Sequence, residues 1–281
     1  MGLPLRGVRA VVLDITGTLQ YANGTVIPGA PDAVRALRTM HLDVRCLSNN
    51  PAQSADQVAH RLNGLTLPNG FPAGFEFADD EVLTAGTLAV RYLVENYVGQ
   101  QVLILEQDGE IARQSAAEGV LIDQPERAVA VLLALHKSPS PNMLIEAARL
   151  IREHGAHFLA TGTDPLWPYE PGCFRYGAGA FVDVVARLSR QKPTVLAKPS
   201  VWSAKVLSES LGKDTHGSSI LVVGDELSTD IRLGHRLRAQ TALVLTGVAQ
   251  PWQRPVFEAS SIRPAVVLDS IADVPSWLDP Q

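Results

Sequence analysis

The sequence contains little cysteine, no excess of basic residues and no long apolar run. Its two cysteines, Cys46 and Cys173, are too few for a disulfide framework and favour a reducing compartment, so we expect a cytoplasmic protein. The formal net charge of -5 gives no electrostatic reason to expect a nucleic acid or an anionic membrane as a partner. Residues 1–10 lack the apolar core of a signal peptide, and no run is long enough to cross a membrane.

The residues that are present are those of an ordinary globular chain. With 46% hydrophobic residues among 281, the chain has enough apolar side chains for a sizeable core. Short apolar runs at residues 8–13, 42–47 and 220–223 suit buried strands, and segments with helical spacing separate them. This alternation predicts an α/β fold with a doubly wound, Rossmann-like parallel sheet.

The alternation of strands and helices is interrupted in the middle of the chain. After a helix that ends near Val98, the pattern restarts with further strands and a helix between residues 102 and 160. The first rhythm returns with a helix at residues 200–211. We therefore predict a discontinuous core of residues 1–98 and 191–281, with an inserted α/β cap of residues 99–190.

Polar residues gather in four segments next to the ends of the predicted elements. These segments are Asp14-Ile15-Thr16-Gly17-Thr18, Leu47-Ser48-Asn49-Asn50, Lys198-Pro199, and Gly224-Asp225-Glu226 with Asp230 shortly after. The carboxyl ends of parallel strands open on one crevice, so we expect these side chains to meet there. Carboxylates hold Mg²⁺, a lysine offsets the charge of phosphoryl oxygens, and hydroxyl and backbone N–H groups complete a phosphate site. Together the segments predict phosphoryl transfer.

Each of these residues also has an ordinary structural explanation when it is taken alone. Asp14 can end a strand in a common turn, Ser48 can cap a helix, and Lys198 can be a solvated surface residue. Asp225 and Glu226 can begin a helix and favour its dipole. The order of the four segments, rather than any single residue, therefore indicates a phosphate site.

That order resembles the haloacid dehalogenase superfamily of phosphohydrolases. The long insertion between the second and third segments resembles the α/β cap of the branch that contains pyridoxal phosphatase. Ala160-Thr161-Gly162-Thr163-Asp164, followed by the glycine-rich residues 176–180, is similar to the end of that cap. Within the branch, two features most resemble phospholysine phosphohistidine inorganic pyrophosphate phosphatase and its relatives. They are the first strand, which ends in Asp14-Ile15, and the absence of a second Asp shortly after it. The resemblance covers nearly the whole chain.

The resemblance implies a nucleophile and a metal site. Asp14 would attack phosphorus and form an aspartyl-phosphate, and Lys198 would orient it and neutralise phosphoryl oxygens. Mg²⁺ would be held by Asp14, the backbone carbonyl of Thr16 and Asp225, with Asp230 as a further ligand or a close neighbour.

The resemblance also implies how a small phosphorylated substrate would be bound. Ser48 and Asn49 would contact the phosphoryl oxygens, and Asp164 would reach down from the cap toward the leaving group. Caps of this branch often mediate dimers, so a homodimer through the cap is an expected partner arrangement.

Thr16 departs from the pattern of the superfamily. Most of its phosphatases have an Asp two residues after the nucleophile, which gives a proton to the leaving group and takes one from water. A hydroxyl does neither near neutral pH, and such general acid–base help is worth about 10²–10⁴ in rate. We therefore expect good leaving groups to be favoured, as in pyrophosphate, phosphoramidates, acyl phosphates and aryl phosphates.

Two other interpretations remain open at the level of the sequence. A protein of the same fold could bind a phosphorylated compound in a regulatory role without turning it over. A flavodoxin-like or receiver-type domain shares an acidic crevice but would not need the inserted cap. We favour the enzyme, because a chain without turnover has little reason to keep Asp14, Lys198 and Asp225 together.

Overall fold

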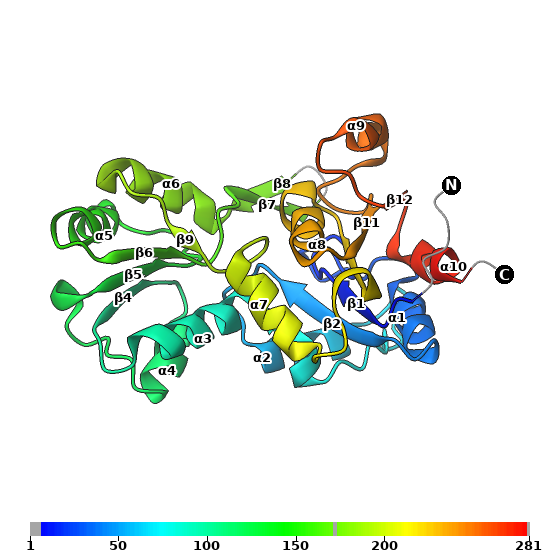
Figure 1. The fold of residues 1–281 in the computed structure, drawn as a ribbon, viewed down its shortest axis with the longest axis horizontal. Coiled ribbons are helices and arrows are strands. Elements are labelled where there is room, and N and C mark those ends of the chain that lie inside the picture. The colour runs from blue at the N-terminus through cyan, green and yellow to red at the C-terminus, as the bar shows by residue number, and fades with distance from the viewer. Residues whose placement is uncertain (1–6, 171–172, 280–281) are drawn as a thin grey trace.

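The computed structural model describes residues 7–170 and 173–279, which form two α/β units that lie side by side (Figure 1). One unit contains a six-stranded sheet in the order β12-β11-β10-β1-β2-β3, and every neighbouring pair is parallel. The other contains a sheet in the order β4-β5-β6-β9, also parallel throughout. The predicted α/β fold, with a parallel-sheet core and an inserted α/β unit, is confirmed.

The strands of the six-stranded sheet come from both ends of the chain. They are β1 (Ala10–Leu13), β2 (Asp43–Ser48), β3 (Val82–Thr84), β10 (Ile220–Gly224), β11 (Gln240–Val244) and β12 (Val266–Leu268). In the central strand β1, Val11 and Leu13 pack into one apolar cluster, and Ala10 and Val12 pack into another on the opposite face. Burial on both faces explains why this strand is an unbroken apolar run.

Helices cover both faces of this sheet, as a doubly wound fold requires. One face packs against α1 (Ala30–Thr39), α2 (Ala55–Asn63) and α10 (Val274–Leu278). The opposite face packs against α3 (Ala85–Tyr97), α7 (Val201–Ser210) and α8 (Arg232–Leu237). A further helix, α9 (Arg254–Ala259), places Phe257 against residues of β11.

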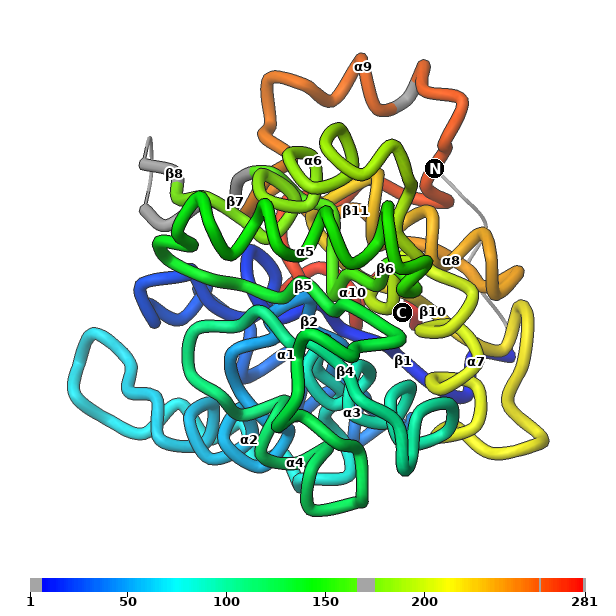
Figure 2. The backbone as a smooth tube through the Cα atoms, turned by 90° about the vertical axis from the view of Figure 1, so that its left-hand side faces the viewer, coloured from blue at the N-terminus to red at the C-terminus, as the bar shows by residue number. Residues whose placement is uncertain are grey.

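The second unit has the same kind of layering on a smaller scale. Its strands are β4 (Val102–Leu105), β5 (Ala130–Leu133), β6 (His157–Ala160) and β9 (Thr194–Val195). Helices α5 (Pro141–Glu153) and α6 (Ala178–Ser189) cover one face, and α3 and α4 (Glu110–Ala117) cover the other (Figure 2). An antiparallel hairpin of β7 (Leu166–Glu170) and β8 (Cys173–Tyr176) joins β6 to α6.

Helix α3 belongs to the packing of both units. Its Leu88 lies in the apolar cluster of the larger sheet, whereas Ala89 and Leu93 lie in the cluster of the smaller sheet. Trp202 of α7 packs against both clusters and donates a hydrogen bond from its indole Nε1 to the Leu88 carbonyl, at 2.8 Å. The two sheets are therefore joined through a continuous apolar contact.

The structure contains several elements that the sequence pattern did not predict. They are the helices α4, α9 and α10 and the hairpin of β7 and β8. After β10, the chain forms a π-helical segment, Leu227–Ile231, which leads directly into α8. Strand β9 lies after residue 190, the predicted end of the cap. No helix in the described part of the chain is long and apolar enough to cross a membrane.

Candidate active site

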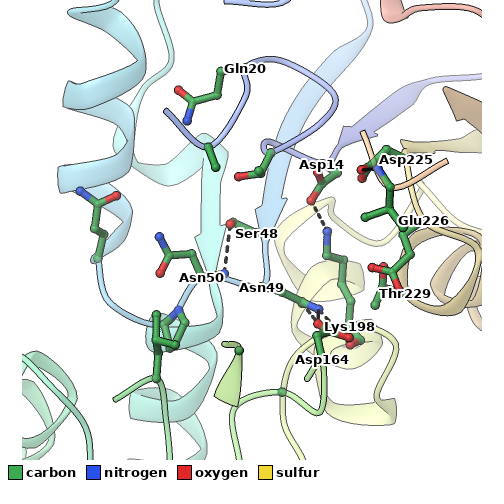
Figure 3. A pocket seen from close by; sticks show the side chains of 18 of the residues that line it. Asp14, Gln20, Ser48, Asn49, Asn50, Asp164, Lys198, Asp225, Glu226 and Thr229 are labelled. Atoms are coloured by element: carbon green, nitrogen blue, oxygen red, sulfur yellow. Dashed lines mark hydrogen bonds and ion pairs between the residues drawn. The ribbon is translucent and has the colours of Figure 1, made fainter. Parts of the chain in front are cut away.

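A cavity of about 420 Å³ lies between the two units and collects the polar segments identified in the sequence. It is lined by residues at or after the ends of β1, β2, β6 and β10. Lys198, which lies between β9 and α7, completes the lining. All of the predicted site residues line it, namely Asp14, Thr16, Ser48, Asn49, Asp164, Lys198, Asp225 and Asp230. Figure 3 labels all of these except Thr16 and Asp230. The structure thus brings together side chains that are up to 216 positions apart.

Lys198 is buried between two carboxylates. Its Nζ lies 2.5 Å from Asp14 Oδ1 and 2.8 Å from Asp230 Oδ1, and its side chain is only 3% exposed. Burial alone would lower the pKa of Lys198, but the two carboxylates outweigh this effect and raise it. The lysine is therefore charged at neutral pH and holds both acids in place.

Burial and Lys198 act in opposite directions on the pKa of Asp14. Burial raises the pKa of its carboxyl group from 3.8 to about 7, although Lys198 acts in the opposite direction. Among the described residues, its Oδ2 is buried without a hydrogen-bond partner. An unpaired buried carboxylate oxygen costs stability, so the position suits a group that binds an added ligand.

Asp225 is positioned by two close backbone segments. Its Oδ2 accepts a hydrogen bond from the Val248 backbone N–H at 2.6 Å. Gly17 and Gly247 lie so near that a Cβ on either would come within 2.3 Å and 1.9 Å of Asp225 Oδ2, respectively. Gly17 also has a φ of +91°, which favours glycine. Only glycine at these two positions leaves room for the carboxylate.

Three carboxylates meet closely enough to share a cation. One ligand oxygen from each of Asp14, Asp225 and Asp230 lies within 4.8 Å of the other two. Burial raises the pKa of Asp225 well above its usual value, and the charges of Asp14 and Asp230 raise it further. Carboxylate oxygens are the ligands that Mg²⁺ prefers, and a cation would relieve this repulsion. The donor set and the unpaired oxygen of Asp14 therefore fit Mg²⁺.

Asn49 links the two units at the floor of the cavity. Its Oδ1 accepts from the backbone N–H of Lys198 at 3.0 Å, and its Nδ2 donates to Asp164 Oδ2 at 3.1 Å. The neighbouring Ser48 Oγ accepts from the backbone N–H of Asn50 at 3.1 Å. The carboxamide of Asn49 thus already has protein partners on both atoms, so its expected contact with phosphoryl oxygens stays a prediction.

Asp164 enters the cavity from the second unit because two glycines pack against its backbone. A Cβ on Gly177 would lie 2.1 Å from the Asp164 carbonyl oxygen, and one on Gly179 would overlap the preceding carbonyl. Burial raises the pKa of Asp164, while the hydrogen bond from Asn49 lowers it. The glycine-rich stretch in the sequence thus has a structural reason, which is to fix this turn.

Family models match both parts of the larger unit, and one of them extends into the smaller unit. Residues 11–120 match the model described as haloacid dehalogenase-like hydrolase, and residues 195–274 match one described as HAD-hydrolase-like. The matched ranges contain Asp14, Ser48, Lys198 and Asp225, and together they cover more than half of the chain. The chain belongs to the haloacid dehalogenase-like hydrolases.

Relatives of this hydrolase are similar over nearly its whole length. The sugar phosphatase AraL of Bacillus subtilis is 26% identical over 264 residues, which are 94% of this chain and 91% of that protein. Chronophin of Mus musculus is 29% identical over a gapped alignment of 293 positions, which covers 99% of this chain and 97% of that protein. The glycerol phosphate phosphatase from Mycobacterium tuberculosis, solved with magnesium, is 26% identical at a TM-score of 0.78. That match covers 96% of this chain and 78% of the other.

The cavity of this hydrolase also contains residues that sequence reasoning missed. They include Gln20 from the segment after β1, Gln53 from the segment before α2, and Arg61 from α2. Arg61 Nη1 donates to Gln20 Oε1 at 2.6 Å, and Arg61 Nε donates to Gln53 Oε1 at 3.0 Å. The helical pattern marks Arg61 only as a polar position, so no signal in the sequence would have placed it in the site.

Proposed function

We propose that the protein is a Mg²⁺-dependent phosphatase that acts on small phosphorylated compounds through an aspartyl-phosphate on Asp14. One observation carries the proposal: Lys198 is buried against Asp14 and Asp230, with Asp225 beside them, at the bottom of a substrate-sized cavity. The names of two relatives, a sugar phosphatase and a glycerol phosphate phosphatase, support a small phosphate ester as the substrate.

The proposed reaction has two steps at the same phosphorus atom. An oxygen of the Asp14 carboxylate forms a bond to phosphorus, and the leaving group departs with the electron pair of the bond that breaks. A water oxygen then attacks the same phosphorus and the bond to Asp14 breaks. Inorganic phosphate is released and the carboxylate is restored, while the proton of the water goes to solvent.

The remaining residues hold charge in place during these steps. Lys198 offsets the negative charge of the phosphoryl oxygens and orients Asp14 through the 2.5 Å contact. Ser48 and Asn49 bind phosphoryl oxygens, and Asp164 contacts the leaving group. Mg²⁺ would be held by Asp14, Asp225 and the Thr16 carbonyl, with Asp230 close by, and would supply positive charge to the phosphoryl oxygens.

The proposal includes a preference for good leaving groups, because Thr16 replaces the general acid. Thr16 lines the cavity, but its hydroxyl does not donate a proton at neutral pH as a carboxylic acid does. Substrates whose leaving groups need little protonation should therefore be turned over best, as in pyrophosphate, phosphoramidates, acyl phosphates and aryl phosphates.

We also retain three proposals about the whole chain. They are a core of residues 1–98 and 191–281 with a cap of residues 99–190, a homodimer through that cap, and a cytoplasmic location. Limited proteolysis, light scattering and cell fractionation would test them in turn.

The test of the function is phosphate release from nitrophenyl phosphate by the wild type and by Asp14→Asn, with Mg²⁺ and with EDTA. Asn keeps the shape of the side chain and removes the nucleophile, so we expect release to fall at least about 10⁴-fold, close to background. EDTA should have a similar effect on the wild type. Normal turnover by Asp14→Asn would reject covalent catalysis through this residue.

A further inference from the structure

Arg61 is a basic residue of the cavity whose described partners are neutral. Its guanidinium donates to the amide oxygens of Gln20 and Gln53, and no carboxylate in the described part of the chain lies within ion-pair distance of it. By contrast, Lys198 in the same cavity contacts two carboxylates. A partly buried guanidinium without a counter-ion is unusual, because partly buried charges are normally paired.

The surroundings of Arg61 give no electrostatic compensation for its burial. Burial lowers the pKa of the guanidinium, and no nearby charge opposes this effect. Two of its five N–H groups are accounted for by the two amide oxygens, and the planar fork leaves further donors for an acceptor in the cavity. The site is therefore suited to an anion that the protein itself does not supply.

Arg61 and its partners lie away from the acidic end of the cavity. Gln20, which contacts Arg61, is 3% exposed, and Figure 3 shows it well apart from Asp225 and Glu226. With its Oε1 directed at Arg61, the Nε2 of Gln20 is a second donor at this end. The cavity thus has a lysine at one end, beside Asp14, and a guanidinium with an amide donor at the other.

We propose that Arg61, held by Gln20 and Gln53, forms a second anion subsite and selects substrates that carry another negative group beyond the scissile phosphoryl group. The proposal rests on the proposed function, since it assigns the phosphoryl group to the Lys198 end. A guanidinium fork binds a carboxylate or a phosphate in the same bidentate geometry, so both are members of the ligand class.

The experiment measures binding in the presence of Mg²⁺ to Asp14→Asn protein, which retains ligand without turnover. Calorimetry compares two matched pairs: glycerol 3-phosphate with 3-phosphoglycerate, which adds a carboxylate, and fructose 6-phosphate with fructose 1,6-bisphosphate, which adds a phosphate. We expect the more anionic member of at least one pair to bind about tenfold or more tightly, as a charge-assisted contact provides. Which pair shows the preference identifies the anion.

Variants at position 61 separate recognition from structure. Asp14→Asn with Arg61→Gln should lose the preference while it binds the less anionic member as before, and Arg61→Lys should keep part of it because the charge remains. Arg35→Gln is the matched control, since it removes an exposed arginine on α1 that does not line the cavity. It should leave both affinities unchanged.

Two outcomes would overturn the proposal. One is equal affinity within both pairs for the Asp14→Asn protein, and the other is an equal loss for both members when Arg61 is changed, which would mark a purely structural contact. Turnover assays on the wild type keep this test separate from the proposed function. Turnover without a preference rejects only the subsite, whereas a preference in binding without turnover rejects only the phosphatase.

Discussion

The three clustered carboxylates around Lys198 outnumber the lysine and arginine side chains that pair with them in the described chain. Burying an ion costs several kcal/mol, and its pairing must offset that cost. Here Lys198 contacts Asp14 and Asp230, yet Asp225 has no lysine or arginine partner in the described chain and relies on a backbone N–H from Val248. The excess of negative charge is what a bound cation would neutralise. A bound metal cation would therefore stabilise the folded site.

Thr16→Asp tests whether this position sets the preference for leaving groups. The new carboxylic acid should help poor leaving groups selectively, so alkyl phosphate turnover should rise by about tenfold. This is below the full range for general acid catalysis because the surroundings are not tuned to the new group. Steady-state and burst kinetics with glycerol 3-phosphate and nitrophenyl phosphate would measure the effect on each step.

An initial burst of product shows which of the two reaction steps Thr16 slows in the wild type. If hydrolysis of the aspartyl-phosphate is slow, the wild type should show a burst and similar turnover numbers for both substrates, and Thr16→Asp should accelerate both. An equal loss on both substrates in a folded variant would contradict the prediction. Thr16 would then be an adapted part of the site, and Glu226, which lines the same cavity, would be the next proton donor to test.

At the scale of elements, the sequence predicted best where a strand or helix is apolar on the side it buries. The apolar runs expected to be strands, at residues 8–13, 42–47 and 220–223, match β1, β2 and β10 to within two residues at each end. The short helices α9 and α10 were missed because each has only one or two turns, which is too short to show a helical period of apolar residues. The hairpin of β7 and β8 lacks a clear alternation of apolar and polar residues.

The candidate site was predictable only in part for a similar reason. Asp14 and Asp225 directly follow strands and Ser48 is the last residue of one, so the parallel topology alone places them at one edge of the sheet. Arg61 reaches the cavity through a long side chain that extends back toward the start of α2, where Gln53 lies. Such a contact depends on the direction of a side chain on a folded helix, which spacing in the sequence does not specify.

Gly17→Ala tests the turn between β1 and the cavity. The added Cβ would lie 2.3 Å from Asp225 Oδ2, and a φ of +91° is unfavourable for alanine. We expect a loss of about 1–2 kcal/mol in the free energy of unfolding and a loss of Mg²⁺-dependent activity of about 10²-fold or more, because Asp225 must move. Chemical denaturation and magnesium titration of activity would measure the two effects.

Gly70→Ala provides the matched control for this turn. Its φ of +83° carries the same backbone penalty, but no atom lies within 4 Å of the added Cβ. The stability loss should be the smaller of the two, because only the backbone strain remains, and the activity should be unchanged. If both variants lose activity equally, backbone strain rather than the position of Asp225 explains the effect of Gly17→Ala.

At the scale of the whole molecule, the candidate catalytic residues lie at the seam, which is the contact region between the two packed units. The cavity is lined from both sides, by Asp14 and Lys198 from one unit and by Thr161 and Asp164 from the other. Helix α3 and Trp202 join the two apolar cores. Because this seam is where buried charge accumulates, the protonation of the site should be visible in the stability of the whole fold.

The last prediction concerns that dependence of stability on pH without metal. The pKa of Asp14 is raised from 3.8 to about 7, mainly by burial, so the folded state binds this proton more tightly than the unfolded chain. The contribution of Asp14 to the free energy of unfolding should therefore fall as pH rises from about 4 to about 7, and stay low above that window.

Asparagine cannot ionise, so in EDTA the Tm of Asp14→Asn should exceed that of the wild type by about 2 °C or more near pH 8, and the difference should shrink near pH 5. Calorimetry at both pH values checks this, and saturating Mg²⁺ should raise the wild-type Tm more near pH 8, since a cation binds the ionised carboxylates in competition with protons. A wild type that stays the more stable protein near pH 8 in EDTA would show that Lys198 fully compensates the buried charge of Asp14.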